Sequence, residues 1–469
     1  MIRHHKRKPS RLRLAIRHSI LAQAAGNPLE QILYSGGVAS LLVLLIGGSE
    51  MQIGIIFTAY YLCRLMGLFL IPYLEVRSRK GLIYRWSLIS VLCITLIFLI
   101  QPVYAALGSM IFFWFLALAL FTYNASSQLG GTAWLPYMYD LLPAPIRGRY
   151  FGQMRTAFRI TTFLGTLLAG WILGKDPGFL NFYVVLLIFI SLSAFRLYFV
   201  RKLPDISPIR SGKLEPLWQN LSKPLTDRSF RRFLVFVLLI WLLYPATKAF
   251  MIPYLKLELG FPTSLVVYAS SCFALGSILS LIAWGKIADK LGSRFTFLTA
   301  VCLLALSYLI VIFVPSYLST AVPAFCLAAV AFLIQGAGFS GMGIAYSVRM
   351  MYEVREEFSG AYITLCRICL GAAGAVGPLI SGAILERLPQ RVVIFNFELF
   401  SKQPFFLIMS ALTLLLLVYL KNLHPIAEQK LGEIIRQLLN SSFGRLNNQL
   451  AQIIGAFNNN KTKDKRSLR

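Results

Sequence analysis

Long apolar runs constrain this chain more than any other feature of its sequence. Twelve segments of about twenty mostly apolar residues follow one another along its 469 residues, and about twenty is the number that an α-helix needs to cross a bilayer. The runs do not alternate apolar and polar residues as the strands of a membrane barrel do. Only 14% of the residues are charged, against roughly 25% in soluble domains. We therefore predict an all-α polytopic membrane protein with twelve transmembrane helices, at about 28–47, 51–73, 82–103, 109–134, 152–174, 180–201, 232–254, 264–288, 294–315, 320–348, 359–385 and 402–421.

Lysine and arginine residues gather in every second connection between these runs, which predicts the orientation of the chain. The alternate connections hold few bases, and those near Gln101 and Pro315 hold none. Both termini are therefore predicted in the cytoplasm, and we expect a multi-pass protein of the cell (inner) membrane. The basic positions are Arg3 to Arg17 in the N-terminal tail, then Arg77 to Lys80, Arg147 and Arg149, Arg201 to Arg232, Lys286 to Arg294, and Arg349 and Arg355.

The formal net charge of +28 follows mostly from this topology, so we do not expect the chain to bind nucleic acid. Basic tails beside a membrane contact anionic lipid headgroups, which makes membrane lipids predicted partners. In the C-terminal tail, apolar residues recur at helical spacing from Leu431 to Phe457. We predict that this stretch lies on the cytoplasmic leaflet, with a protein partner as the alternative.

The second half of the chain repeats the first. Aligned acids and arginines are the informative matches, because similar apolar composition alone would not align them. We therefore predict five parts: a basic cytoplasmic N-terminal tail at 1–27, a six-helix bundle at 28–201, a cytoplasmic linker at 202–231, a second six-helix bundle at 232–421 and a cytoplasmic tail at 422–469. The matches are Ser127, Gly130, Met138, Tyr139 and Asp140 with Ser340, Gly343, Met351, Tyr352 and Glu353, and then Gly148, Tyr150, Arg155, Gly165 and Gly170 with Gly360, Tyr362, Arg367, Gly377 and Gly382.

One connection carries a recognisable motif, Gly285-Lys-Ile-Ala-Asp289-Lys-Leu-Gly292-Ser-Arg294. It resembles the signature loop between the second and third helices of each half in the major facilitator superfamily. The resemblance covers roughly residues 28 to 421 and implies two pseudo-symmetric bundles with a solute site between them. It also implies a secondary transporter that works by rocker-switch alternating access as a monomer, with a proton or sodium ion as a possible coupling ion. The equivalent loop of the first half, Ile71 to Lys80, lacks both glycines and has Glu75 in place of the usual aspartate.

The resemblance also implies a cytoplasmic lock. Such loops lie near the cytoplasmic start of a helix in the opposite half, where a carboxylate gains about 0.3–1 kcal/mol from the helix N-terminus. Plain solvation of the loop charges is the alternative. The expected contacts are Asp289, in the loop shaped by Gly285 and Gly292, with the helix near Gly148 and with Arg149 or Arg155; Glu75 with the helix near Gly360 and with Arg367; Asp140 with Arg79 or Lys80; and Glu353 with Arg294.

In this family the first, fourth, seventh and tenth helices line the cavity, and here those helices hold polar or aromatic residues. Small polar residues can equally hold helices together. Ionisable residues inside a membrane are functional candidates, and Arg64 in the second span and Lys248 in the seventh are of this kind. No acid falls in the middle of a predicted span, which favours an anionic or zwitterionic solute. The cavity candidates are Gln31, Tyr34, Arg64, Asn124, Gln128, Trp241, Tyr244, Lys248 and Gln335.

Other functional classes find less support in the sequence. An enzyme would need an acid–base pair, an activated nucleophile or metal ligands inside the spans, and we predict no enzyme, cofactor or metal. There is no Gly-x-x-x-x-Gly-Lys-Ser/Thr motif for ATP. Two alternatives stay open beside a solute transporter. One is a transport-inactive sensor or scaffold on the same fold, which would explain the altered first loop, and the other is a transporter of amphiphiles or lipids.

Overall fold

The computed structural model describes residues 9–74, 77–206, 222–317, 319–354, 359–389, 391–394, 397–400 and 402–423. In this part of the chain nearly all regular structure is helical, as predicted. One short antiparallel hairpin pairs β1 (Arg391–Ile394) with β2 (Phe397–Phe400). The helices are α1 (Pro9–Tyr34), α2 (Val38–Leu45), α3 (Glu50–Met66), η1 (Gly67–Leu74), α4 (Arg79–Thr95), η2 (Leu96–Leu99), α5 (Ile100–Leu141), α6 (Ala144–Leu173), α7 (Phe179–Lys202), α8 (Lys223–Thr226), α9 (Arg228–Pro253), η4 (Tyr254–Glu258), α10 (Thr263–Ile312), α11 (Ala321–Glu353), α12 (Ser359–Arg387) and α13 (Gln403–Leu420).

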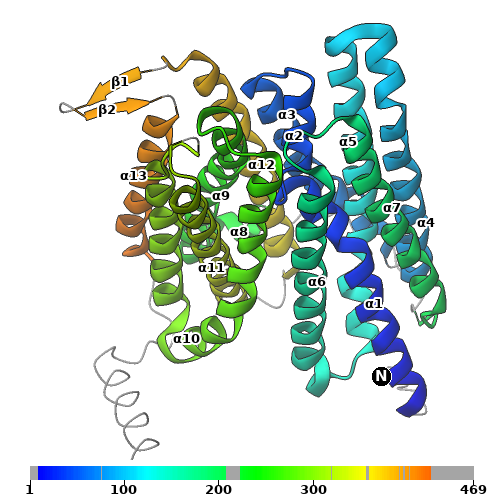
Figure 1. Ribbon diagram of the computed structural model, residues 1–469. Helices are drawn as coiled ribbons and strands as arrows, with labels where there is room; N and C mark the ends of the chain where they lie inside the picture. The colour runs from blue at the N-terminus through cyan, green and yellow to red at the C-terminus, as the bar shows by residue number, and fades with distance from the viewer. Residues whose placement is uncertain are drawn as a thin grey trace, which may run out of the picture.

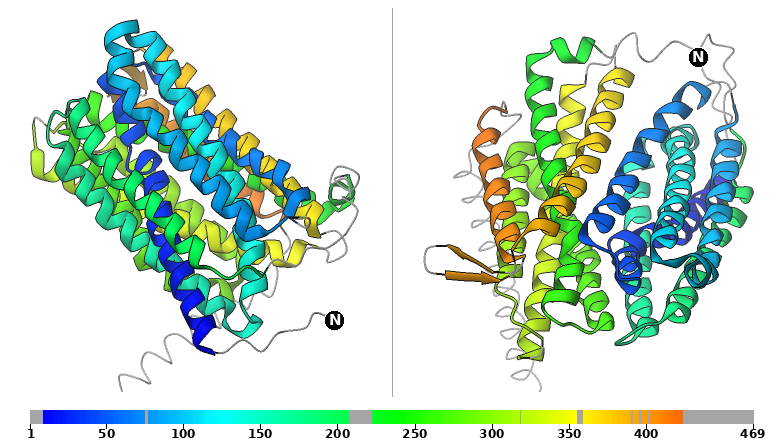
Figure 2. Two further views of the ribbon diagram at one scale, coloured as in Figure 1. Left: turned by 90° about the vertical axis from the view of Figure 1, so that its right-hand side faces the viewer. Right: turned by 90° about the horizontal axis from the view of Figure 1, so that it is seen from above.

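The helices form two groups that stand side by side (Figures 1 and 2). The first group contains α1 to α7 and the second contains α9 to α13. They meet mainly where α3 packs on α12 and α6 packs on α10. We call the two ends of this assembly the basic end, which carries the starts of α1, α4, α6, α9 and α12, and the hairpin end, which carries β1 and β2.

Among the described residues, ten helices are long and apolar enough to cross a membrane, or eleven if α1 and α2 form one bent span. The 50-residue helix α10 consists of two helices that meet at Gly292, whose φ of 77° and ψ of 173° are not helical. A residue with a side chain would be strained there, so this glycine permits the turn predicted between 288 and 294. The count of twelve crossings, and the side of the membrane on which the termini lie, stay predictions.

The first span differs from its predicted bounds of 28–47. Helix α1 begins at Pro9 and packs on α6 and α7, so most of the predicted N-terminal tail is part of the helix. Arg13 and Arg17 interrupt the apolar run, but both side chains are exposed, while Ala15 and Ala22 are buried against the neighbouring helices. The helix stops at Tyr34, and α2 continues at an angle of 43° after Gly36 and Gly37.

Close contact between the groups depends on glycines in α3 and α12. A Cβ atom on Gly54 would lie 2.6 Å from the carbonyl oxygen of Pro378, and one on Gly382 would lie 2.9 Å from that of Glu50. The backbones of α3 and α12 can therefore approach this closely only because Gly54 and Gly382 lack side chains. Gly54 and Gly382 thus serve close helix packing between the two groups, whereas Gly377 of α12 meets Leu242 of α9 within the second group.

Candidate functional site

A chain of polar contacts runs between α1 and α3 near the centre of the molecule. The hydroxyl of Tyr60 donates to Glu30 Oε1 at 2.7 Å and accepts a hydrogen bond from Arg64 Nη2 at 3.0 Å. Because Tyr60 and Arg64 are four residues apart on α3, they share one face of that helix. The guanidinium of Arg64 also lies 4.9 Å from the ring centroid of Tyr61 and 5.4 Å from that of Trp241. A carboxylate and a guanidinium group thus share one tyrosine hydroxyl.

Glu30 corrects the prediction that no acid lies in the middle of a span. The predicted first span begins at residue 28 and places Glu30 near its end. Since α1 begins at Pro9 instead, Glu30 lies well inside the bent span formed by α1 and α2. Its carboxylate is partly buried and is hydrogen-bonded to Tyr60. Glu30 is therefore a functional candidate to add to the cavity residues predicted from the sequence.

Tyr34 and Asn124 extend the same region toward α5. The ring of Tyr34 stacks on that of Tyr60, with centroids 4.0 Å apart. Its hydroxyl accepts a hydrogen bond from Asn124 Nδ2 at 2.5 Å, and Asn124 also donates to the carbonyl oxygen of Leu120. Asn124 Oδ1 is buried and has no hydrogen-bond partner within the described ranges. Such an unsatisfied acceptor in a protein interior is uncommon, and here it lies beside the central polar contacts.

Lys248 on α9 reaches across to the first group of helices. Its Nζ donates to Ser35 Oγ at 2.8 Å, and Ser35 in turn donates to Gln31 Oε1 at 3.3 Å. The same ammonium group lies 4.4 Å from the ring centroid of Phe273 and 5.6 Å from that of Tyr244. The contact brings the predicted residues Gln31 and Lys248 to one place from opposite halves of the chain.

Aromatic side chains of the second group lie against Arg64 and Lys248. We call Trp241, Tyr244 and Phe339 the aromatic wall. Trp241 lies edge-on to Tyr61 of α3 at 6.2 Å and to Tyr244 at 6.2 Å. Tyr244 stacks on Phe339 of α11 at 4.8 Å. Ring faces attract cations, so the wall suits the lysine and arginine that lie against it.

A cavity of about 160 Å³ adjoins this wall on the side of the basic end. Arg159 lines it from α6, with its guanidinium 6.0 Å from the ring centroid of Phe273. The remaining lining comes from both groups of helices and includes Arg155, Phe158, Ser277, Phe339 and Ser340. The central site therefore continues into a hollow between α6, α10 and α11.

Positive charge exceeds negative charge in this central region. Within the described part of the chain, Arg64, Arg159 and Lys248 lie there with Glu30 as the one carboxylate. Taking a cation out of water costs several kcal/mol, and a ring face returns only about 0.5–2 kcal/mol. The site thus holds basic groups whose charge is incompletely balanced.

Contacts between the two groups close the hairpin end. Lys402, just before α13, is buried and lies 2.7 Å from Glu50 of α3 and 3.2 Å from Glu258 of η4. Lys256 lies 3.5 Å from Asp176, which is exposed. The backbone N–H of Ser264 donates to the carbonyl oxygen of Gly174 at 2.8 Å. We call the triad of Lys402, Glu50 and Glu258 the hairpin-end bridge.

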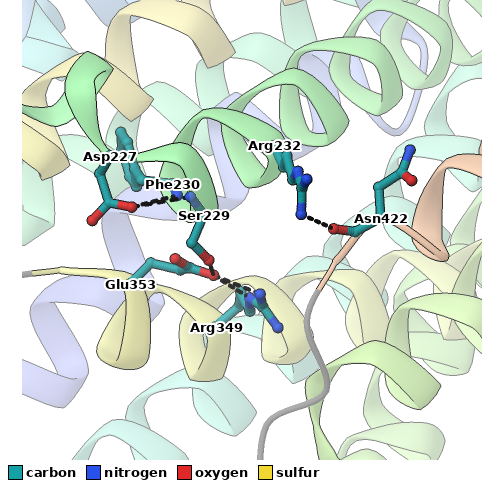
Figure 3. Close-up of polar contacts among 7 residues, drawn as sticks. All are labelled: Asp227, Ser229, Phe230, Arg232, Arg349, Glu353 and Asn422. Carbon is teal, nitrogen blue, oxygen red and sulfur yellow. Dashed lines mark hydrogen bonds and ion pairs between the residues drawn. The ribbon is translucent and has the colours of Figure 1, made fainter.

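At the basic end, each described ion pair joins two residues of the same group of helices, and none of them links the two groups. Asp140 pairs with Arg79, one of its two predicted partners. Glu353 accepts hydrogen bonds from Arg349 Nε at 2.7 Å and from Ser229 Oγ at 3.1 Å, as Figure 3 shows. In this conformation Glu353 holds Arg349, which lies one helical turn before it on the same face. Its predicted contact with Arg294 stays a prediction.

The contacts predicted for Asp289 are not made in this conformation. Asp289, Arg149 and Arg155 are all exposed, and α6 begins at Ala144 rather than near Gly148. Lys80 donates to the carbonyl oxygen of Arg201, within its own half. Glu75 lies outside the described residues, so its predicted contact with Arg367 lies outside them too. The role of these residues as a lock stays a prediction.

Two predicted cavity residues sit apart from the central contacts. Gln335 is fully buried, and its Nε2 donates to the sulfur of Met251 at 2.9 Å. Gln128 is partly buried one turn beyond Asn124, and its backbone carbonyl accepts a hydrogen bond from Thr132. Lys402 and Arg159 are not among the cavity or lock residues predicted from the sequence. Lys402 follows the β1–β2 hairpin, and its carboxylate partners are distant in the chain.

Comparison with known proteins identifies the family. The family model described as Major Facilitator Superfamily matches residues 29–378 and 248–450. The chain belongs to the Major Facilitator Superfamily. Both this family and its fold are those of transporters rather than enzymes. No curated protein matches the chain by sequence.

Solved structures of superfamily transporters share the fold. The nucleoside transporter NupG is 16% identical, with a TM-score of 0.64 over 88% of this chain and 98% of that chain. The xylose transporter XylE from E. coli, in a partially occluded inward open conformation, is 14% identical, with a TM-score of 0.62 over 89% and 98%. A bacterial homologue of the iron transporter ferroportin in its inward-facing state is 13% identical, with a TM-score of 0.65 over 89% and 99%. At these identities the likeness shows the fold alone.

The ferroportin homologue also allows a comparison of conformations. Its outward-facing structure gives a TM-score of 0.58 at 14% identity over 88% of this chain and 99% of that chain, lower than the 0.65 of its inward-facing structure. Both comparisons show the shared fold.

Proposed function

We propose that this superfamily member is a secondary transporter that moves a small organic solute across the cell membrane by rocker-switch alternating access. The basic end would face the cytoplasm and the hairpin end the outside. The arrangement described here would then be the inward-facing state, with the hairpin-end bridge closed. The unpaired Asp289 would engage the first half only after the molecule switches to the outward-facing state.

One observation carries this proposal. Polar and basic side chains from both halves converge between the bundles, where Lys248 of α9 donates to Ser35 beside α1 and Arg64 of α3 lies against Trp241 of α9. Buried ionisable groups are expensive inside a membrane and usually mark a substrate or ion pathway. A scaffold without transport would gain nothing from such groups at the junction of two rocking halves.

The first experiment is a ligand search followed by a flux assay. A metabolite and lipid library is tested for thermal stabilisation of the purified protein, with Arg64→Ala run in parallel. Each ligand that stabilises the unmodified protein is then offered to proteoliposomes. We expect a small organic solute to stabilise the protein, to do so more weakly in the variant, and to enter vesicles saturably. A ligand that binds at Arg64 but never crosses the membrane would favour the sensor, and lipids as the only ligands would favour the amphiphile transporter.

A further inference from the structure

Three bases from three helices surround the space between the bundles. Arg64 projects from α3, Arg159 from α6 and Lys248 from α9. Arg159 and Lys248 lie 6.0 and 4.4 Å from the ring centroid of Phe273, and Arg64 lies against Trp241, which contacts Tyr244 beside Lys248. The bases come from both halves of the chain, so only the assembled site brings them together. Like charges repel one another, and an anion bound among them relieves that repulsion.

The one acid of the region is engaged elsewhere. Glu30 accepts from Tyr60, and its charge acts on Arg196 of α7 as well as on Arg64. Lys248 has a neutral hydroxyl and aromatic rings as its neighbours, and Arg159 has the rings of Phe158 and Phe273. A ring face compensates a buried cation less well than a carboxylate does. In the described part of the chain, Lys248 and Arg159 therefore lack a carboxylate partner.

The surroundings of the bases also constrain the rest of the ligand. Trp241, Tyr244 and Phe339 form a continuous aromatic surface between Arg64 and Lys248. Next to Phe339 and Arg159 lies the cavity of about 160 Å³. A flat or apolar molecular body fits such rings, and a charged end group fits the bases at the border of the rings.

We propose that the solute is an organic anion, whose carboxylate or phosphate group binds among Arg64, Arg159 and Lys248 while its apolar body lies on Trp241, Tyr244 and Phe339. This inference rests on the proposed function, because it names the substrate class of the same central site. The anion supplies the negative charge that Lys248 and Arg159 lack, next to the Arg64 guanidinium that Tyr60 links to Glu30. Both acid types accept hydrogen bonds from guanidinium and ammonium groups, so the choice between them is left to the experiment.

The test uses matched probes that differ in charge. Benzoate, succinate and phenyl phosphate are each compared with their uncharged counterparts, benzamide, succinamide and phenol, in thermal-shift titrations of the full chain at constant ionic strength. We expect the anions to raise the melting temperature and their neutral partners to leave it unchanged. Lys248→Met and Arg64→Gln should weaken the apparent affinity about tenfold or more, whereas Lys421→Met, which removes an exposed base at the basic end, should leave it unaltered.

Each outcome decides one question. Response to the carboxylates alone, or to phenyl phosphate alone, supports the proposal and identifies the acid group. Equal stabilisation by neutral and anionic members of a pair, or no response to any anion, overturns it. The proposed function is tested separately by spin-label distances at the two ends of the molecule, because these distances report movement of the halves without any ligand.

Discussion

At the scale of single residues, the hydroxyl of Tyr60 bridges Glu30 and Arg64 by hydrogen bonds. Replacing Tyr60 by Phe keeps the ring that stacks on Tyr34 at 4.0 Å but removes the donor for Glu30 and the acceptor for Arg64. Leaving two charged groups without that partner should cost about 1–3 kcal/mol of stability. Thermal unfolding of the purified variant measures this, with Tyr104→Phe as the control because Tyr104 is partly exposed near the hairpin end. Equal melting temperatures for Tyr60→Phe and the unmodified protein would show that the Tyr60 hydroxyl does not contribute to stability.

A second residue-scale prediction concerns the buried pair of Arg349 and Glu353. The side chain of Arg349 is 1% exposed and that of Glu353 is 6% exposed, so solvent screens the pair little. Glu353→Gln keeps the shape and an acceptor for Ser229 but removes the charge that faces Arg349. We expect a loss of about 3 kcal/mol, the lower end of the cost of breaking a buried ion pair. Glu386→Gln, which changes an exposed acid on α12, should alter the unfolding temperature little, and a similar response from both variants would contradict the account.

At the scale of helices, close packing of α10 on α11 depends on glycine. A Cβ atom on Gly276 would lie 2.0 Å from the carbonyl oxygen of Leu333, whereas one on Gly285 of the same helix would meet nothing within 4 Å. Gly276→Ala should therefore push the helices apart and destabilise the fold by about 1–3 kcal/mol. Gly285→Ala should be neutral or slightly stabilising, because alanine favours the helix. Thermal unfolding of the two variants compares them directly, and equal stability would mean that the helices are not held this closely.

The helices also show what the sequence could predict. Apolar run length predicted the all-helical class and placed most spans within a few residues, because burial in lipid demands long apolar helices. It failed at the first helix, where exposed Arg13 and Arg17 lie on one side of a helix whose opposite side packs on α6 and α7. The length of an apolar run cannot reveal a helix that packs on its neighbours with one side only. Glu30 was misplaced for the same reason.

The candidate site was predictable in part. The family resemblance led to Asn124 and Trp241, and the search for ionisable residues inside the spans led to Arg64 and Lys248. The structure brings Arg64 and Lys248 to contacts between the bundles and places Asn124 against Tyr34 of α1. It could not lead to Lys402, whose partners Glu50 and Glu258 are more than 140 residues away in the chain. Long-range pairs of this kind leave no local pattern. Arg349, by contrast, lies one helical turn from Glu353, so helical spacing could have suggested this pair, but the repeat pattern pointed to Arg294 instead.

At the scale of the whole molecule, we expect the two halves to rock against each other, so that one end opens as the other closes. The hairpin-end bridge joins them through Lys402, which is 5% exposed, and Glu50, which is 22% exposed. Removing Lys402 leaves partly buried carboxylates without their base, which should shift the balance between the two states by about 1–3 kcal/mol, or roughly 5- to 150-fold. Lys256→Ala breaks the exposed bridge to Asp176 and should change the balance by less than about 1 kcal/mol.

The measurement that tests alternating access most directly is the distance between spin labels at both ends, without any ligand. In a background lacking the native cysteines, one pair replaces the exposed Leu180 and Phe313 at the hairpin end, and the other replaces the exposed Gln153 and Met351 at the basic end. The account predicts a short hairpin-end distance and a long basic-end distance in the parent protein. In Lys402→Ala, the first distance should lengthen as the second shortens, with little change in Lys256→Ala. Fixed distances at both ends, or ends that open together, would contradict the proposal that this protein is a rocker-switch transporter.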